Sequence, residues 1–259
     1  MNGEKQYVNL KLGKIYRFAG YYWTICELDK AHNTAVLQSH GVTGGAWPGF
    51  KMEKFGNSDY YVNSIDGQDI SGYDDKMQSL YDIIKEVEDT SATYGKGLYL
   101  ISMEKDGFTG WAAPGSGNYW QAMKTAAKNF RSFGAAYSDG AWFGNVVDSK
   151  NAWYVHSNGS IYGSYQENNF VIAPAFNFDV SKVDVVDNEI VIKGRGYAKT
   201  NTDKSLTVEK NVKKARLILA ITEQVSENNF ERHYKTVEIE VAESANLADY
   251  DIIGGEWIS

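Results

Sequence analysis

The sequence predicts an α+β protein, in which a mixed domain with two helices and a small antiparallel sheet precedes a smaller all-β domain. Composition supports this class, because 18 Tyr and 25 Gly with only 3 Pro favour strands and loops over a helical bundle. Two segments repeat apolar residues at helical spacing, and the C-terminal part is dense in valine and isoleucine. A length of 259 residues allows one large or two smaller domains.

Short strands open the chain. They are predicted at residues 7–12, 14–18, 21–28 and 34–39. Gly13 divides the first pair, and the polar residues 29–33 form a turn between the second pair. Residues 41–72 show no clear period, so we expect loops there.

Two helices follow. Asp74 or Asp75 can cap the first one, which the helical spacing of its apolar residues predicts. These residues are Met77, Leu80, Tyr81, Ile84 and Val87. The second helix is predicted over residues 116–132, with Ser116 as N-cap and Gly134 placed to end it. A buried strand at residues 95–102 is expected between the two helices.

A hairpin is predicted after the second helix. Residues 152–156 and 161–165 alternate around Asn158-Gly159, a pair that favours a type I′ turn. A further turn at residues 166–169 leads into a strand over residues 170–178. Pro174 indicates an edge position or a bulge in that strand.

The character of the sequence changes after Ser181. Strands are predicted at residues 183–193, 215–222 and 235–241, the last with strict alternation. We therefore divide the chain into a mixed domain at residues 1–181 and a β-rich C-terminal domain at residues 182–259.

Several segments resemble a known family. Trp142 is followed by Asn-Ala-Trp-Tyr-Val at 151–155, the Asn158-Gly159 turn and Pro-Ala-Phe-Asn-Phe-Asp-Val-Ser at 174–181. Residues 22–29 and 97–102 resemble the opening and central strands of an uncharacterised domain family of gut bacteria and their phages. This resemblance implies a C-type-lectin-like fold for residues 1–181. Formylglycine-generating enzymes and the ligand-binding variable proteins of phage retroelements share that fold.

The residues available for catalysis are few. Cys26 is the only cysteine, which excludes intrachain disulfides, cysteine-based zinc sites and the cysteine-pair chemistry of formylglycine-generating enzymes. Nucleotide-binding loops, zinc-protease motifs and a serine-hydrolase elbow are absent. We expect no cofactor, with bound calcium as the alternative. Its candidate ligands are Asp74, Asp75, Asp148, Asp184 and Asp187.

Charge and hydropathy limit the partners and the location. The net charge is −7 and no basic cluster occurs, so we expect no nucleic-acid binding. No apolar window of ~18 residues and no secretory h-region occur, so we expect no membrane insertion and no signal peptide. The expected location is the cytoplasm before lysis, or a virion.

The aromatic segment at residues 141–179 suits binding, because it combines Tyr and Trp with Ser, Gly and Asn, as antibody paratopes do. Alternation assigns Trp153, Val155, Ile161 and Gly163 to the core side of the hairpin. Trp142, Phe176 and Phe178 are also expected in the core. The predicted ligand-binding residues are Tyr154, His156, Tyr162, Tyr165, Asn168 and Asn169.

These features predict a non-enzymatic ligand-binding or adhesion protein, encoded by a phage or prophage. Its expected partner is a bacterial surface glycan or protein, and we expect a homo-oligomer. The alternative function is a structural virion component, such as a decoration, baseplate or fibre-tip subunit that contacts other virion subunits. A hydrolase is the third hypothesis. It is less favoured, because a glycosidase needs two carboxylates on either side of the scissile bond, and no spacing in the sequence singles out such a pair.

Overall fold

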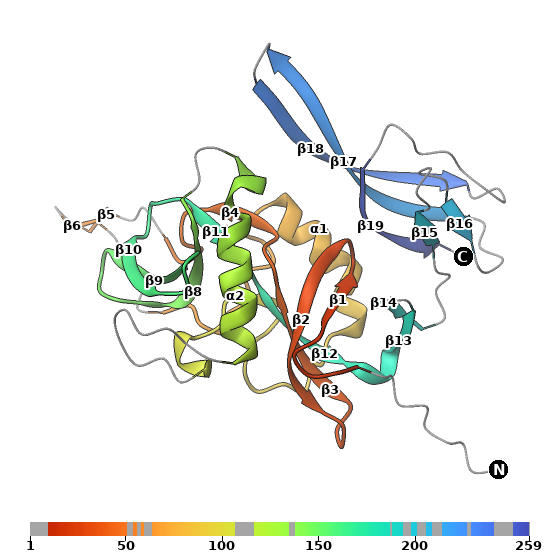
Figure 1. The fold of residues 1–259 in the computed structure, drawn as a ribbon, viewed down its shortest axis with the longest axis horizontal. Coiled ribbons are helices and arrows are strands. Elements are labelled where there is room, and N and C mark those ends of the chain that lie inside the picture. The colour runs from red at the N-terminus through yellow and green to blue at the C-terminus, as the bar shows by residue number, and fades with distance from the viewer. Residues whose placement is uncertain are drawn as a thin grey trace. The chain divides into compact units, whose positions relative to one another are not determined.

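The computed structural model describes most of the chain. The described residues are 10–50, 54–55, 58–59, 64–106, 117–134, 138–186, 188–193, 198–200, 206–208, 214–226, 229–240 and 251–258. Two α-helices and several mixed sheets occur in these ranges, which confirms the predicted α+β class (Figure 1).

Contacts within the chain define two compact units. The first comprises Met1–Tyr16 and Tyr22–Ser181, and the second comprises Arg17–Tyr21 and Lys182–Ser259. The second unit therefore begins at Lys182, where we placed the second domain, but it also includes a short segment from the N-terminal part. Strand pairing explains the difference, because Arg17 lies opposite Glu189 in a parallel pair. The division into two independently folding domains stays a prediction.

One sheet has seven strands and joins segments that are far apart in the sequence. In spatial order they are β13 (Val183–Val186), β14 (Glu189–Ile192), β1 (Ile15–Phe18), β2 (Tyr21–Asp29), β3 (Thr34–Ser39), β12 (Ala175–Asp179) and β7 (Leu98–Tyr99). The sheet is therefore larger than the small antiparallel sheet that we expected, and it is mixed, because β1 and β14 pair in parallel. The late strand β12 pairs antiparallel with β3 on one side and with β7 on the other. The register of β2 shifts between Ile25 and Glu27, so Cys26 lies at a β-bulge.

A second sheet of five strands carries the hairpin. Its spatial order is β10 (Ile161–Tyr165), β9 (Asn151–His156), β8 (Gly140–Val146), β11 (Phe170–Ile172) and β4 (Thr43–Gly45). Helix α2 (Asn118–Lys128) packs on one face of this sheet, here called the inner face (Figure 1). Its buried Met123, Ala126 and Ala127 join one apolar cluster with side chains of β8, β9 and β10.

Pro174 marks the passage of the chain from one sheet to the other. Residues 170–178 were predicted as one strand with Pro174 at an edge position or a bulge. This prediction is wrong, because β11 and β12 belong to different sheets and each has neighbours on both sides. Proline has no N–H to donate to a strand hydrogen-bond ladder. A position between two strands avoids the need for that bond, just as an edge position would. The Pro174 carbonyl still accepts a hydrogen bond from the Ser39 N–H at 3.0 Å.

Both predicted helices are present, and their bounds lie close to the predicted ones. Helix α1 (Asp75–Ile84) is capped by Asp74, whose side chain accepts a bond from the Met77 N–H at 2.8 Å. Helix α2 is shorter than predicted, and its N-cap is Gly117 without a side-chain bond. Ser116 lies outside the described residues. One-turn 3₁₀ segments are η1 (Lys85–Val87), η2 (Met103–Asp106), η3 (Asn129–Phe133) and η4 (Val180–Lys182).

The strand predicted at residues 95–102 is only two residues long, β7. Gly95 and Gly97 have φ values of +79° and +57°, outside the extended region, so the ladder cannot extend upstream. Instead the Leu98 N–H donates to the Ser71 hydroxyl at 3.0 Å. This segment is nevertheless buried, as predicted.

Beyond η4 the described elements of the second unit are all strands. They are β13 (Val183–Val186), β14 (Glu189–Ile192), β15 (Ala198–Thr200), β16 (Leu206–Val208), β17 (Lys214–Ser226), β18 (Asn229–Glu240) and β19 (Asp251–Ile258). The long strand β17 pairs antiparallel with β18 and with β19. The strands predicted at residues 215–222 and 235–241 fall largely within β17 and β18.

In the first unit, β5 (Lys54–Phe55) and β6 (Ser58–Asp59) form a separate small pair.

Candidate functional site

The predicted hairpin exists, with Tyr162 opposite Tyr154 and Ile161 opposite Val155. Its turn differs from the prediction, because only Gly159 has a positive φ, at +94°, and a type I′ turn would need one at Asn158 too. The His156 N–H donates to the Ser160 carbonyl at 2.8 Å, which closes a three-residue loop. Helix α2 packs against this turn, and the Trp120 indole donates to the Gly159 carbonyl at 3.0 Å.

The core side of the hairpin is the one predicted. Trp153 is 9% exposed, and Val155 and Ile161 are fully buried in the cluster beneath α2. Trp142, Phe176 and Phe178 are fully buried as well, which confirms their assignment to the core. Tyr154, His156 and Tyr162 alternate with the core residues and are partly exposed.

The opposite side of the sheet, here called the outer face, carries an aromatic cluster of Trp142, Tyr154, Tyr162 and Phe170. The Tyr154 ring stacks on Phe170 with centroids 4.3 Å apart, and Trp142 meets Phe170 edge-on at 4.6 Å. Tyr162 lies beside Tyr154, with ring centroids 6.0 Å apart. Gly140 makes room for this packing, since a Cβ there would lie 2.5 Å from atoms of both Tyr154 and Phe170.

Tyr154 therefore has a packing role in addition to its predicted binding role. Burial raises the pKa of its phenol, and the nearby Asp139 carboxylate raises it further. Tyr162, at the end of the cluster, packs less closely and is the better probe of binding alone.

One end of the outer face is polar. The His156 Nε2 lies 3.2 Å from Asp139 Oδ1, and the Ser157 hydroxyl donates to Asp139 Oδ2 at 2.7 Å. The Asn158 N–H donates to His156 Nδ1 at 3.1 Å, so the proton of the neutral ring belongs on Nε2, facing Asp139. Both ring nitrogens are thus engaged, and the carboxylate fixes the direction of the ring.

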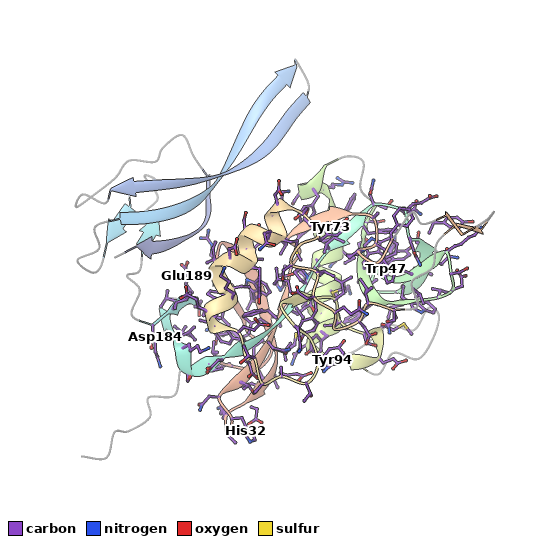
Figure 2. All side chains as sticks on the ribbon, turned by 180° about the vertical axis from the view of Figure 1, so that it is seen from behind. His32, Trp47, Tyr73, Tyr94, Asp184 and Glu189 are labelled. Carbon is purple, nitrogen blue, oxygen red and sulfur yellow. The ribbon has the colours of Figure 1, made fainter. Side chains whose placement is uncertain are left out.

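The other end of the outer face holds Ser164, Gln166 and Asn168. The exposed Asn168 amide donates to the Ser164 hydroxyl at 2.8 Å. Gln166 is only 2% exposed, yet neither Nε2 nor Oε1 of its side chain has a hydrogen-bond partner. Its main chain is fixed, since its N–H donates to the Lys150 carbonyl and its carbonyl accepts from the Trp47 N–H. The Trp47 side chain is itself buried (Figure 2).

The structure brings together Tyr154, His156 and Tyr162, and connects Asn168 to their face through Ser164. Tyr165 is 57% exposed but has the parity of Ile161 and Gly163, so it does not share that face. Asn169 is exposed, and its side chain makes no hydrogen bond to the other predicted residues in the described part of the chain. The sequence reasoning missed Asp139, Ser157 and Gln166. Only Gln166 could have been found, since it continues the alternation of Tyr162 and Ser164.

The candidate calcium ligands that the structure describes do not form a metal-binding group. In the part of the chain that the structure describes, no group of three or more His, Cys, Asp or Glu is arranged to hold a metal ion. Asp74 caps α1, and Asp148 accepts bonds from the main chain at Lys150 and Asn151. The bond from Lys150 and then the Asn151 side chain lower the pKa of Asp148. Asp187 lies outside the described residues.

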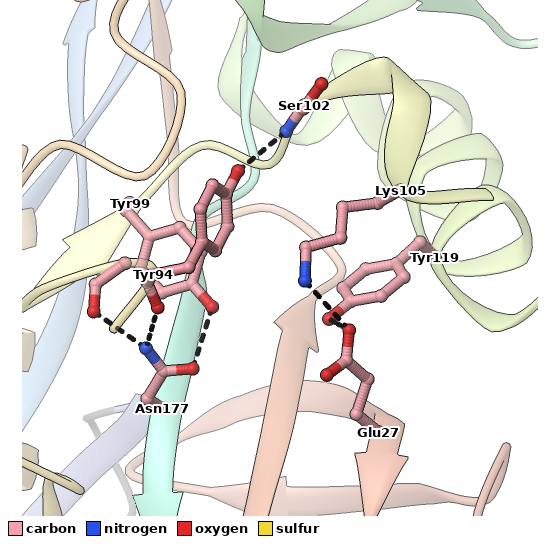
Figure 3. Close-up of polar contacts among 8 residues, drawn as sticks. Glu27, Tyr94, Tyr99, Ser102, Lys105, Tyr119 and Asn177 are labelled. Atoms are coloured by element: carbon pink, nitrogen blue, oxygen red, sulfur yellow. Dashed lines mark hydrogen bonds and ion pairs between the residues drawn. The ribbon is translucent and has the colours of Figure 1, made fainter. Parts of the chain in front are cut away.

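A second polar cluster lies near the bulge of β2. Glu27 Oε1 accepts the Tyr119 hydroxyl at 2.8 Å and lies 3.0 Å from Lys105 Nζ (Figure 3). Burial raises the pKa of Tyr119 well above its usual range. Close by, the Asn177 amide donates to the carbonyls of Tyr94 and Gly95 and accepts the Tyr99 hydroxyl. These contacts tie α2, η2 and the loop before β7 to the first sheet, which is a structural role.

Comparison with family models, with curated proteins and with solved structures found no match to this chain. Among the helices that the structure describes, none has the length and apolar character needed to cross a membrane.

Proposed function

We propose that this chain is a non-enzymatic ligand-binding protein that recognises a bacterial surface glycan through the outer face of its five-stranded sheet. The observation that carries the proposal is the Tyr154–Tyr162 pair, partly exposed, with hydrogen-bonding groups at both ends of its face. Aromatic rings stack on the apolar faces of sugars, while Asp139 and Asn168 offer acceptors and donors to hydroxyls.

The resemblance noted in the sequence supports a finer proposal. The two helices and the mixed sheets are compatible with a C-type-lectin-like fold, and the retroelement variable proteins bind ligands late in that fold. On this proposal the protein is an adhesion protein encoded by a phage or prophage. A non-enzymatic role is supported by His156, whose two ring nitrogens are occupied by Asp139 and by the Asn158 N–H.

The test is a glycan array with the full chain, followed by calorimetry on the best ligand with single variants. Tyr162→Ala should weaken binding by about 1–3 kcal/mol, roughly 5-fold to 150-fold, because truncated aromatic hot spots lose that much. Its melting temperature should change little. Tyr165→Ala is the matched control, since this exposed tyrosine has the opposite parity, and it should bind like the wild type.

Trp153→Ala tests the other side of the hairpin. Removing this buried indole should cost about 3–5 kcal/mol of stability, as large core aromatics do. If Tyr162→Ala binds like the wild type while Tyr165→Ala does not, the site lies on the other side of β10. If both bind normally, the outer face is not the binding site.

A further inference from the structure

The side chain of Gln166 is unusual, because it is buried while both of its polar atoms lack a partner. Such an amide destabilises the folded state, since folding removes the water that bonds to it in the unfolded chain. Native proteins retain few groups of this kind, and those they retain often serve a functional site.

Gln166 belongs to the outer face by register. Its N–H donates to the Lys150 carbonyl at 2.9 Å, which continues the β10–β9 ladder one residue beyond Tyr165. Alternation then puts Gln166 on the same face as Ser164 and Tyr162. At about 3.3 Å per residue it lies roughly 13 Å along the strand from Tyr162. The unpaired amide is thus at the end of the proposed binding face.

Ser164 lies between the aromatic end of this face and Gln166 along β10. Its hydroxyl is covered by the exposed amide of Asn168 through one bond of 2.8 Å. A single neutral hydrogen bond in contact with water is exchanged easily for a bond to a ligand. The main chain of Gln166, in contrast, is held from both sides by Trp47 and Lys150. The backbone of Gln166 is therefore already in place before any ligand binds.

We propose that Gln166 binds an amide group of the ligand, and that the glycan bound by the outer face carries N-acetylated sugars. This inference rests on the proposed function. A carboxamide presents an N–H donor and a C=O acceptor side by side, and the acetamido group of an N-acetyl sugar presents the complementary pair. The two groups can therefore form two hydrogen bonds at once. Both unpaired atoms of Gln166 would be satisfied by that one partner.

The experiment compares β-1,4-linked oligosaccharides of equal length made of N-acetylglucosamine, glucosamine or glucose, by calorimetry with the full chain. The wild type should bind the N-acetylated compound most tightly. Gln166→Leu keeps a similar shape without the amide, so it should lower that affinity ~10-fold and leave the affinity for the glucose oligomer unchanged. It should also raise the melting temperature, since it removes a buried amide without partners.

Gln38→Leu is the matched control. Gln38 is a fully buried glutamine of β3 whose Oε1 also lacks a partner, but its Nε2 donates to the Ala173 carbonyl at 2.6 Å. This variant should melt earlier and keep the sugar preference. A higher melting temperature of Gln166→Leu with unchanged preference would mean that the amide is only structural, which overturns the inference.

The wild-type preference between the N-acetylated and glucose oligomers can still overturn the inference if Gln166→Leu does not fold. Equal affinity for the N-acetylated and glucose oligomers overturns the role of Gln166 but leaves the proposed function standing. Failure to bind any sugar overturns both.

Discussion

Acid should destabilise this protein through His40, a buried histidine at the end of β3. His40 is 8% exposed, and its Nε2 lies 2.8 Å from the Thr24 hydroxyl. Burial lowers the pKa of His40 from 6.5 to about 4. The unfolded chain therefore binds a proton on this ring between pH 6.5 and about 4, where the folded chain does not.

This difference in proton binding sets both the direction and the size of the change in stability with pH. The stability that comes from neutral His40 is fully present above pH 6.5 and is lost as the pH falls toward 4. Because one pKa unit corresponds to roughly 1.4 kcal/mol, the free energy of unfolding should fall by up to about 3 kcal/mol across this window. Urea denaturation at several pH values between 7 and 4 measures the loss.

Two variants separate His40 from other titrating groups. His40→Gln cannot titrate, so its stability should depend less on pH in this window than that of the wild type, whatever its stability at pH 7. His32→Gln is the control, because the Asp29 carboxylate raises the pKa of the exposed His32. A raised pKa contributes stability at low pH and loses it as the pH rises, so this variant should keep the acid loss. An unchanged pH dependence in His40→Gln would refute the assignment.

Two further predictions concern single side chains. Asn177→Ala removes three hydrogen bonds, to Tyr94, Gly95 and the Tyr99 hydroxyl, and should lower the free energy of unfolding by about 3 kcal/mol in urea denaturation. An unchanged urea midpoint would contradict the structural role of this cluster. Cys26→Ser replaces a buried thiol at the bulge of β2 and should cost less than ~2 kcal/mol without affecting glycan binding. Lost binding in a folded variant would show that the thiol is functional, and the binding role would have to be abandoned.

Local signals in the sequence predicted the elements that depend on neighbouring residues. Helix α1 follows from the Asp74 cap and the spacing of Met77, Leu80 and Ile84, all within one segment. The two faces of the hairpin follow from alternation in the same way. Pro174 also gave a local signal, but its structural consequence depended on the distant strands with which the segments on either side of it pair. The sequence therefore indicated an irregularity at Pro174, but not that β11 and β12 belong to different sheets.

The candidate site was predictable to the same extent. Tyr154, His156 and Tyr162 alternate along two adjacent strands, so their shared face was visible from spacing. Asp139 reaches His156 only because β8 pairs with β9, and nothing near Asp139 in the sequence indicates that pairing. The exposure of Tyr165 was predicted, whereas its parity placed it away from the other tyrosines.

The position of β12 between β3 and β7 affects how the protein folds during synthesis. Strand β3 must pair with a segment made much later, since Gln38 bonds to Ala173, 135 residues further along the chain. At about 5–20 residues per second, the ribosome needs roughly 7–30 s to supply this partner. For that time one edge of β3 has no native neighbour, and an unpaired edge can join strands of other nascent chains. The early strands of this protein are therefore candidates for chaperone binding until Pro174 and β12 have left the ribosome.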